Sequence, residues 1–218
     1  MINIAIDGPS GAGKSTAAKA IAKQLNILYL DTGAMYRALA LKAFRLGVDP
    51  NDKEKVEAFL PAVSVDVRYR DGVMELYLDG EEVSGFIREH HISKGASDIS
   101  KIPAVRLKLV ELQRAIAAKN DVVLDGRDIT SYVLPNAEYK FYLTASPEVR
   151  AKRRYDELTA KGQTVSYEQI LADVIDRDYN DMHRDFAPLV QMADSVLVDS
   201  SDMSADEVVE LILSYVKR

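Results

Sequence analysis

The sequence of 218 residues contains no cysteine and only three histidines. The absence of cysteine excludes disulfide bonds, thiolate metal sites and a cysteine nucleophile. The histidines, His90, His91 and His183, do not have the spacing of a metal-binding cluster, and we expect each to be solvated or bonded locally. Thiol chemistry and a histidine-rich metal centre are therefore excluded.

The sequence also has no long apolar run and no excess of positive charge. No segment approaches the roughly 20 apolar residues of a membrane span, and no basic stretch followed by an apolar run marks a secretory signal. The net charge of −6 argues against a nucleic-acid polymer or an anionic membrane as partner. These absences predict a cytoplasmic protein and still allow a local arginine cluster around a small phosphate ligand.

A glycine-rich segment at residues 8–16 is the strongest positive signal. An apolar run at residues 2–6 precedes it and a helix-forming run at residues 17–25 follows, which is the strand–loop–helix order of a phosphate-binding loop. Glycines let the backbone turn tightly and present its N–H groups as an anion nest at a helix start. The residues predicted to hold the phosphates of a nucleoside triphosphate, which the resemblance given below identifies as ATP, are Gly8, Pro9, Ser10, Gly11, Ala12, Gly13, Lys14, Ser15 and Thr16.

Two side chains of this loop carry the predicted chemistry. Lys14 would bring a cation to the outer phosphates, and the Ser15 hydroxyl would bind Mg²⁺, which prefers hard oxygen ligands. Asp125 directly follows an apolar run at residues 122–124, and it would hold Mg²⁺ through water or cap a helix. The sequence therefore predicts a nucleoside triphosphate with Mg²⁺.

Strands and helices alternate along most of the chain. We expect core strands at residues 2–6, 28–30, 122–125, 139–143 and 195–198, and helices at 17–25, 34–46, 104–119 and 147–161, followed by helices that begin with capping boxes at 166–169 and 204–207. This order predicts an α/β fold with a five-stranded parallel sheet flanked by helices. Its ligands should lie at the carboxyl ends of the strands, which carry residues 31–32, 125–128, 145–146 and 199–200.

One segment breaks the alternation. Apolar residues recur at every second position in residues 63–67 and 74–78, with turn sequences at 70–72 and 79–80, and Val83 is expected to begin a third strand. A helix is expected at residues 86–101. We predict one domain with a core at 1–33, 103–148 and 185–218, a lobe at 34–102 carrying the antiparallel insert at 63–83, and a helical lid at 149–184.

Arginines gather at strand ends and on the helices that follow them. Arg150, Arg153 and Arg154 share one helix face, and Arg177, Asp181 and Arg184 share another. Like charges on one face repel, so bound phosphate is a better explanation than a solvated surface. A phosphorylated acceptor would account for the surplus, because a phosphate dianion needs no general base and its reaction depends on positioning and charge neutralisation.

Five motifs together resemble bacterial cytidylate kinases over nearly the whole chain. They are GPSGAGKST at 8–16, DTGAMYR at 31–37, DGRDI at 125–129, SPEVRAKRR at 146–154 and RDYNDMHR at 177–184. The resemblance implies transfer of the γ-phosphoryl group of ATP to CMP or dCMP in pyrimidine nucleotide metabolism. It also implies small nucleotides as partners. We further expect no nucleic-acid polymer or membrane as partner, and a monomer.

The resemblance also implies roles for individual residues. The CMP site would consist of Thr32, Tyr36, Arg37, Ser97, Arg106, Arg127, Asp128, Arg177, Asp181 and Arg184. Within it, Ser97, Arg106 and Asp128 would contact cytosine, and Arg37 and Arg127 would hold the acceptor phosphate. The catalytic residues would be Lys14, Arg127, Arg150, Arg153 and Arg154. Uracil reverses the donor and acceptor pattern of cytosine, so these contacts would select CMP over UMP.

The sequence departs from this family at one place. The family usually has Gly-Thr after the GRD-[IM] motif, where this chain has Thr130 and Ser131. We therefore expect a different conformation of this loop, which leaves the tolerance for UMP open.

Three other functions remain as alternatives. A kinase for a hydroxyl acceptor would need a carboxylate base, for which Asp31 is the candidate. A GTP-binding switch protein would carry an N-K-x-D signature, which is missing here. A non-catalytic ATP-binding module would leave the many arginines without a role.

Overall fold

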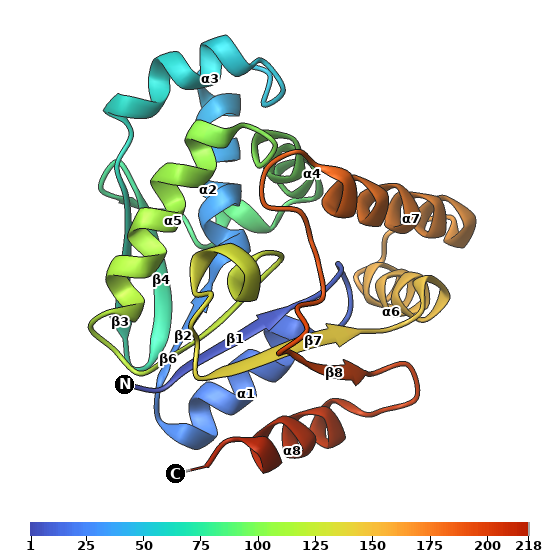
Figure 1. Ribbon diagram of the computed structural model, residues 1–218. Helices are drawn as coiled ribbons and strands as arrows, with labels where there is room; N and C mark the ends of the chain where they lie inside the picture. Colours follow the sequence, from blue (N-terminus) through green and yellow to red (C-terminus); the bar gives the residue numbers. More distant parts are fainter. Residues whose placement is uncertain (218) are drawn as a thin grey trace. The chain divides into compact units, whose positions relative to one another are not determined.

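The computed structural model describes residues 1–217, apart from the side chain of His90. The predicted solvation of His90 and the last residue of the predicted core lie outside the described residues. The chain forms two compact units, one of Met1 with Leu28–Asp121 and the other of Ile2–Ile27 with the chain from Val122 onward (Figure 1). Each is described by itself, and the predicted division into core, lobe and lid remains a proposal.

A five-stranded sheet forms the centre of the fold, with the strand order β2-β6-β1-β7-β8. The strands are β1 (Asn3–Asp7), β2 (Leu28–Asp31), β6 (Val122–Gly126), β7 (Tyr139–Thr144) and β8 (Val196–Asp199). β1 pairs in parallel with β6 and β7, in registers that place Ile6 beside Asp125 and Phe141, and β7 pairs in parallel with β8. β6 is buried at every position, as expected for a strand inside a parallel sheet. The predicted fold class is confirmed.

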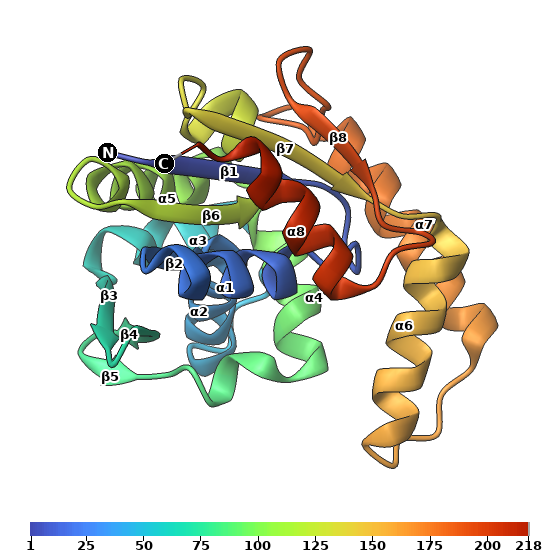
Figure 2. The same cartoon turned by 90° about the horizontal axis from the view of Figure 1, so that it is seen from below.

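The longer helices in the described part of the unit that contains β1 come from both sides of the chain's other unit in sequence. They are α1 (Lys14–Leu25), α6 (Pro147–Ala160), α7 (Tyr167–His183) and α8 (Ala205–Tyr215). α1 packs against α8, and α6 lies beside α7 (Figure 2). Buried Ala151 and Leu158 of α6 pack with Ile170 of α7, so the helix pair has its own small apolar core. This packing holds the arginines of both helices in one subassembly.

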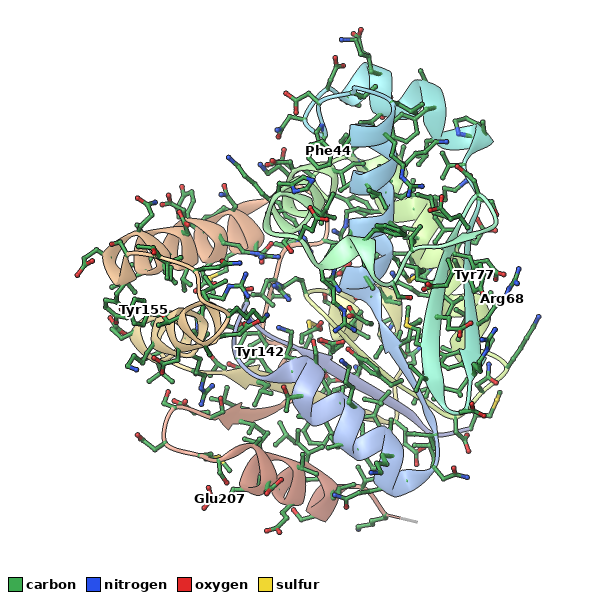
Figure 3. All side chains as sticks on the ribbon, turned by 180° about the vertical axis from the view of Figure 1, so that it is seen from behind. Phe44, Arg68, Tyr77, Tyr142, Tyr155 and Glu207 are labelled. Carbon is green, nitrogen blue, oxygen red and sulfur yellow. The ribbon has the colours of Figure 1, made fainter. Side chains whose placement is uncertain are left out.

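The other unit contains the predicted antiparallel insert. It comprises α2 (Thr32–Arg45), α3 (Lys53–Phe59), η1 (Leu60–Ala62), β3 (Val65–Arg70), β4 (Val73–Leu78), β5 (Glu81–Glu82), η2 (Phe86–Arg88), α4 (His90–Ile99) and α5 (Pro103–Ala117). β3 pairs with β4 and β4 with β5, all antiparallel. On this hairpin the Arg68 guanidinium lies 4.1 Å from the centroid of the Tyr77 ring (Figure 3). Buried Leu76 and Leu78 give β4 its packed face.

Several predicted local features are wrong in detail. The helix expected at 86–101 is divided into η2 and α4, because Glu89 has an extended backbone (φ −68°, ψ 150°). The third strand of the insert is β5, just before Val83. The capping box at Ser166 is incomplete: the Ser166 hydroxyl accepts from the Gln169 N–H, but the Gln169 side chain donates to Asp173 and does not accept from the Ser166 N–H.

Two further boundaries follow from local hydrogen bonding. α2 begins at Thr32, earlier than expected, because the Asp31 carboxylate accepts from the Ala34 N–H and caps it. The capping box of α8 between Ser204 and Glu207 is complete, as predicted. An unexpected π-helical turn at Ile129–Val133 follows the DGRD motif.

Candidate active site

The glycine-rich loop has the backbone of an anion-binding site. It begins at Gly8, which directly follows β1 and has φ 148°. A Cβ there would lie 1.9 Å from the carbonyl oxygen of Leu143, so no side chain fits. The loop ends at Gly13, which has φ 93° and precedes α1 without a side-chain cap in the described structure. The first N–H groups of α1 are therefore available for an anion.

Lys14 is a buried cation at the start of this helix. Its side chain is held by a 2.6 Å hydrogen bond from Nζ to the Pro9 carbonyl, and the residue is 5% exposed. Burial lowers the pKa of Lys14 to about 7, and the charge of Arg127 acts in the same direction, whereas Asp125 and Asp181 oppose it. A bound polyphosphate would place negative charge beside Lys14 and so favour its charged form.

Ser15 and Asp125 are brought together as predicted for a Mg²⁺ site. The Ser15 hydroxyl donates a 2.8 Å hydrogen bond to Asp125 Oδ2, which joins α1 to the end of β6. Both side chains offer hard oxygens, so the pair fits this cation. Within residues 1–217 no cluster of three or more His, Asp or Glu side chains could hold a metal, His90 apart. A cation here would need phosphate and water oxygens as well.

A network of opposite charges includes four predicted CMP-binding residues. Arg127 Nε donates to Asp181 Oδ2 at 2.7 Å, and Arg184 lies 3.7 Å from Asp128 and 4.0 Å from Asp181. Burial alone would raise the pKa of Asp181, but the charges of Arg127, Arg177 and Arg184 hold this pKa below its ordinary value. The surrounding arginines therefore keep the Asp181 carboxylate ionised although it is buried.

Arg150, the first arginine of α6, is built into the fold. Its guanidinium makes a two-pronged ion pair with Asp178 of α7, at 3.0 and 2.6 Å, and it is 2% exposed. Nη1 also donates to the carbonyl of Ser10 in the glycine-rich loop at 3.1 Å, and Nε donates to Ala145 at 2.8 Å. Arg150 of α6 thus connects the glycine-rich loop to α7.

The other two α6 arginines have different surroundings. Arg153 donates to the carbonyl of Ser200 at 2.6 Å and to the Ser200 hydroxyl at 3.2 Å. Arg154 pairs with Glu157 one turn along at 2.8 Å, and its side chain is 37% exposed. The three arginines that the sequence groups on one face therefore meet three different environments.

The unit formed by Leu28–Asp121 holds further predicted site residues. The Arg37 guanidinium donates to Asp31 Oδ2 at 2.9 Å, beside the capped N-terminus of α2, where Thr32 is buried. The Arg106 guanidinium of α5 lies 5.3 Å from the centroid of the Tyr36 ring. Arg106 is almost completely buried, with 1% of its surface exposed. A fully buried arginine stacked on an aromatic ring is costly unless it serves a ligand or a polar network.

Ser97 and Arg106 are linked through one residue. Arg106 Nη1 donates to the carbonyl of Ser100 at 3.3 Å, and the Ser100 hydroxyl donates to the carbonyl of Ser97 at 2.8 Å. Two residues that were predicted to contact cytosine, Ser97 of α4 and Arg106 of α5, therefore both bond to Ser100 at the end of α4.

A cavity of about 230 Å³ adjoins the glycine-rich loop, and the sequence alone did not predict it. Its lining includes Gly13, Thr16, Arg153, Ser200 and Met203. The Ser200 hydroxyl is tied to the loop by a 3.1 Å hydrogen bond to the Ala12 carbonyl. Ser200 follows β8, and ligands were expected beyond the strand ends, so its position was predicted. Its contact with the loop was not predicted, because Ser200 belongs to no recognised motif.

Comparison with known proteins identifies relatives over the full chain. A family model described as cytidylate kinase matches residues 4–218. A cytidylate kinase of Caldicellulosiruptor bescii is 48% identical over 212 residues, which cover 97% of this chain and 94% of the relative. One from Clostridioides difficile is 47% identical over 98% of this chain and 97% of its own length.

A solved structure supports the fold alone. A protein of Eubacterium ventriosum, titled as uncharacterized, matches with a TM-score of 0.54 at 13% identity, and the match covers 99% of this chain and 98% of that one. No helix in the described part of the chain has the length and apolar character to cross a membrane.

Proposed function

The chain belongs to the cytidylate kinase family, and on this basis we propose that it transfers the γ-phosphoryl group of ATP to CMP and dCMP, giving ADP with CDP or dCDP. It is a nucleoside monophosphate kinase, a phosphotransferase with a phosphate acceptor. The full-length family match carries this conclusion. The buried network of arginines supports it, because a phosphate acceptor requires positive charge rather than a base.

The donor is proposed to bind at the glycine-rich loop. The N–H groups at the start of α1 and the Lys14 ammonium would neutralise the ATP phosphates. Mg²⁺ is the proposed cofactor, with Ser15 as a ligand and Asp125 holding it through water, and it would offset phosphate charge. The 230 Å³ cavity beside Thr16 and Met203 is the proposed place for the donor nucleoside.

The acceptor is proposed to bind the residues that the resemblance assigns. These are Thr32, Tyr36, Arg37, Ser97, Arg106, Arg127, Asp128, Arg177, Asp181 and Arg184. Arg37 and Arg127 would hold the acceptor phosphate against the donor, while their present partners, Asp31 and Asp181, keep both guanidiniums in place. Arg106 and Asp128 would pair with the cytosine edge.

Separate tasks in the transfer are proposed for two of the α6 arginines. Arg153, which lines the cavity, would face the donor, and Arg150, which donates to the Ser10 carbonyl, would hold the phosphate-binding loop in place. The charge that develops on the transferred phosphoryl group would then be met by fixed cations, which need no reorganisation during the reaction. We further propose that the enzyme is a cytoplasmic monomer.

A panel of acceptors tests this function. Formation of ADP from ATP with Mg²⁺ would be measured with CMP, dCMP, UMP, AMP, shikimate and no acceptor. We expect turnover with CMP and dCMP well above that with every other acceptor. Turnover with shikimate alone would favour a hydroxyl acceptor, and turnover without any acceptor would favour a nucleotide hydrolase.

A further inference from the structure

Asp7 is a fully buried carboxylate that the proposed reaction does not use. It is the last residue of β1 and has no exposed surface. Burial raises the pKa of Asp7 to about 6, although three hydrogen bonds oppose this shift. Arg127, Asp128 and Tyr142 are the other charged or titratable groups near it. A carboxylate in this position is costly, so its hydrogen bonds need an explanation.

All three hydrogen bonds go to one loop more than a hundred residues away. Oδ1 accepts from the Ile129 N–H at 2.8 Å, and Oδ2 accepts from both the N–H and the hydroxyl of Thr130, each at 2.7 Å. The two carboxylate oxygens of Asp7 thus accept hydrogen bonds from two successive residues. We name this set of three bonds the Asp7–Thr130 clamp.

The clamp fixes the segment that carries Arg127 and Asp128. Ile129 and Thr130 open the π-helical turn, whose Tyr132 and Val133 N–H groups both donate to the Asp128 carbonyl at 2.9 Å. Asp128 itself has an irregular backbone (φ −143°, ψ 24°). The Asp7 bonds to the next two residues therefore hold the chain directly after Asp128 in place.

The clamp also reaches the donor loop through the chain itself. Asp7 directly precedes Gly8, whose close approach to Leu143 fixes the start of the phosphate-binding loop. Asp7 therefore connects the start of the proposed donor site with the loop that follows Asp128, which is proposed to contact the acceptor base. Loss of this connection would displace Asp128 relative to the proposed ATP phosphates.

We propose that Asp7 and Thr130 are positioning residues that hold Asp128 in the geometry that selects cytosine. This inference rests on the proposed function, in which Asp128 contacts the acceptor base. It also gives a role to the departure from the usual family sequence at position 130, because the Thr130 hydroxyl supplies one of the three bonds.

Three variants of the loop test the proposal. Thr130→Val keeps the shape and the N–H bond but removes the hydroxyl, whereas Thr130→Ser keeps the hydroxyl. Ser131→Ala is the matched control, since the Ser131 hydroxyl has no hydrogen-bond partner within the described structure. For each protein we would measure kcat/KM for CMP and UMP, the KM for ATP, and the melting temperature.

We expect Thr130→Val to lower kcat/KM for CMP about tenfold, the effect of one hydrogen bond to a charged group. UMP should change little, so the CMP/UMP ratio narrows about tenfold while the KM for ATP stays within about twofold. Thr130→Ser and Ser131→Ala should behave like the wild type. An unchanged CMP/UMP ratio in Thr130→Val, whatever its melting temperature, would overturn the inference.

A double-mutant cycle separates positioning from general damage. In an Asp128→Asn background, Thr130→Val should no longer change the CMP/UMP ratio, because its effect passes through Asp128. An undiminished effect in that background would overturn the inference. Failure of the proposed function is a different result, because the wild type itself would then not phosphorylate CMP.

Discussion

The hydroxyl of Ser15 donates a 2.8 Å hydrogen bond to Asp125 Oδ2, and this bond joins two residues that are 110 positions apart. Ser15 is the second residue of α1 and Asp125 is the last but one of β6, so the parallel pairing of β1 with β6 brings the two together. Two hard oxygens at the mouth of an anion site are suited to a cation bound with polyphosphate.

Asp125→Asn tests this pair as the Mg²⁺ site. The neutral side chain should raise the Mg²⁺ concentration for half-maximal activity about tenfold or more, as is usual when an outer partner of a metal is lost. Initial rates at increasing Mg²⁺ and fixed CMP would measure this. Asp156→Asn, which removes an exposed aspartate paired with Lys152, is the control and should leave the Mg²⁺ requirement unchanged. Identical Mg²⁺ curves for all three proteins would place the cation elsewhere.

The pKa of Lys14 leads to a prediction about proton uptake. Burial lowers this pKa to about 7 in the free protein, so at pH 8 the amine is about nine-tenths neutral. A bound polyphosphate favours the charged form and raises the pKa, so ATP binding should take up nearly one proton at pH 8 and about half a proton at pH 7. Calorimetry in buffers of different ionisation enthalpy measures this uptake.

Lys14→Met provides the comparison for proton uptake. It removes the titrating amine but leaves the N–H groups of the loop, so ATP should still bind, more weakly, without uptake at pH 8. Equal uptake in both proteins would assign the proton to another group.

The sequence predicts most of the fold because its signals are local or strictly periodic. The apolar runs that became β1 and β6, the turn at Asp71–Gly72 and the Ser204 cap are each determined by neighbouring residues. The break at Glu89 was missed because the sequence there has no proline or glycine to mark it.

Less of the candidate site could be predicted from the sequence, because its details depend on tertiary contacts. The grouping of Arg150 with Arg154 followed from helix periodicity, but their environments depend on Asp178 and Ser10 in one case and Glu157 in the other. The clamp by Asp7 was missed for the same reason, since its partners lie 122 and 123 residues away.

The contrast between Arg150 and Arg154 can be tested through stability. Arg150→Met leaves Asp178 as a nearly buried carboxylate without its partner, and it should lower the free energy of unfolding by about 3 kcal/mol. Arg154→Met removes an exposed pair within one helix and should change this free energy by less than about 0.5 kcal/mol. Urea unfolding of the three proteins at pH 7 measures both values. Similar losses in the two variants would contradict the structural distinction.

Asp128→Asn tests how the acceptor base is chosen. The Asp128 carboxylate, 3.7 Å from Arg184, is proposed to accept from the cytosine N4 amine, and asparagine can turn a donor toward the O4 of uracil. We expect kcat/KM for CMP to fall by a factor equivalent to roughly 2–4 kcal/mol, with little loss for UMP, because the partner left in a closed site is unpaired. Asp185→Asn, an exposed neighbour of Arg184, is the matched control and should keep the wild-type CMP/UMP ratio. If Asp128→Asn also keeps that ratio, cytosine is read by other groups, and Arg106→Met would be the next variant to measure.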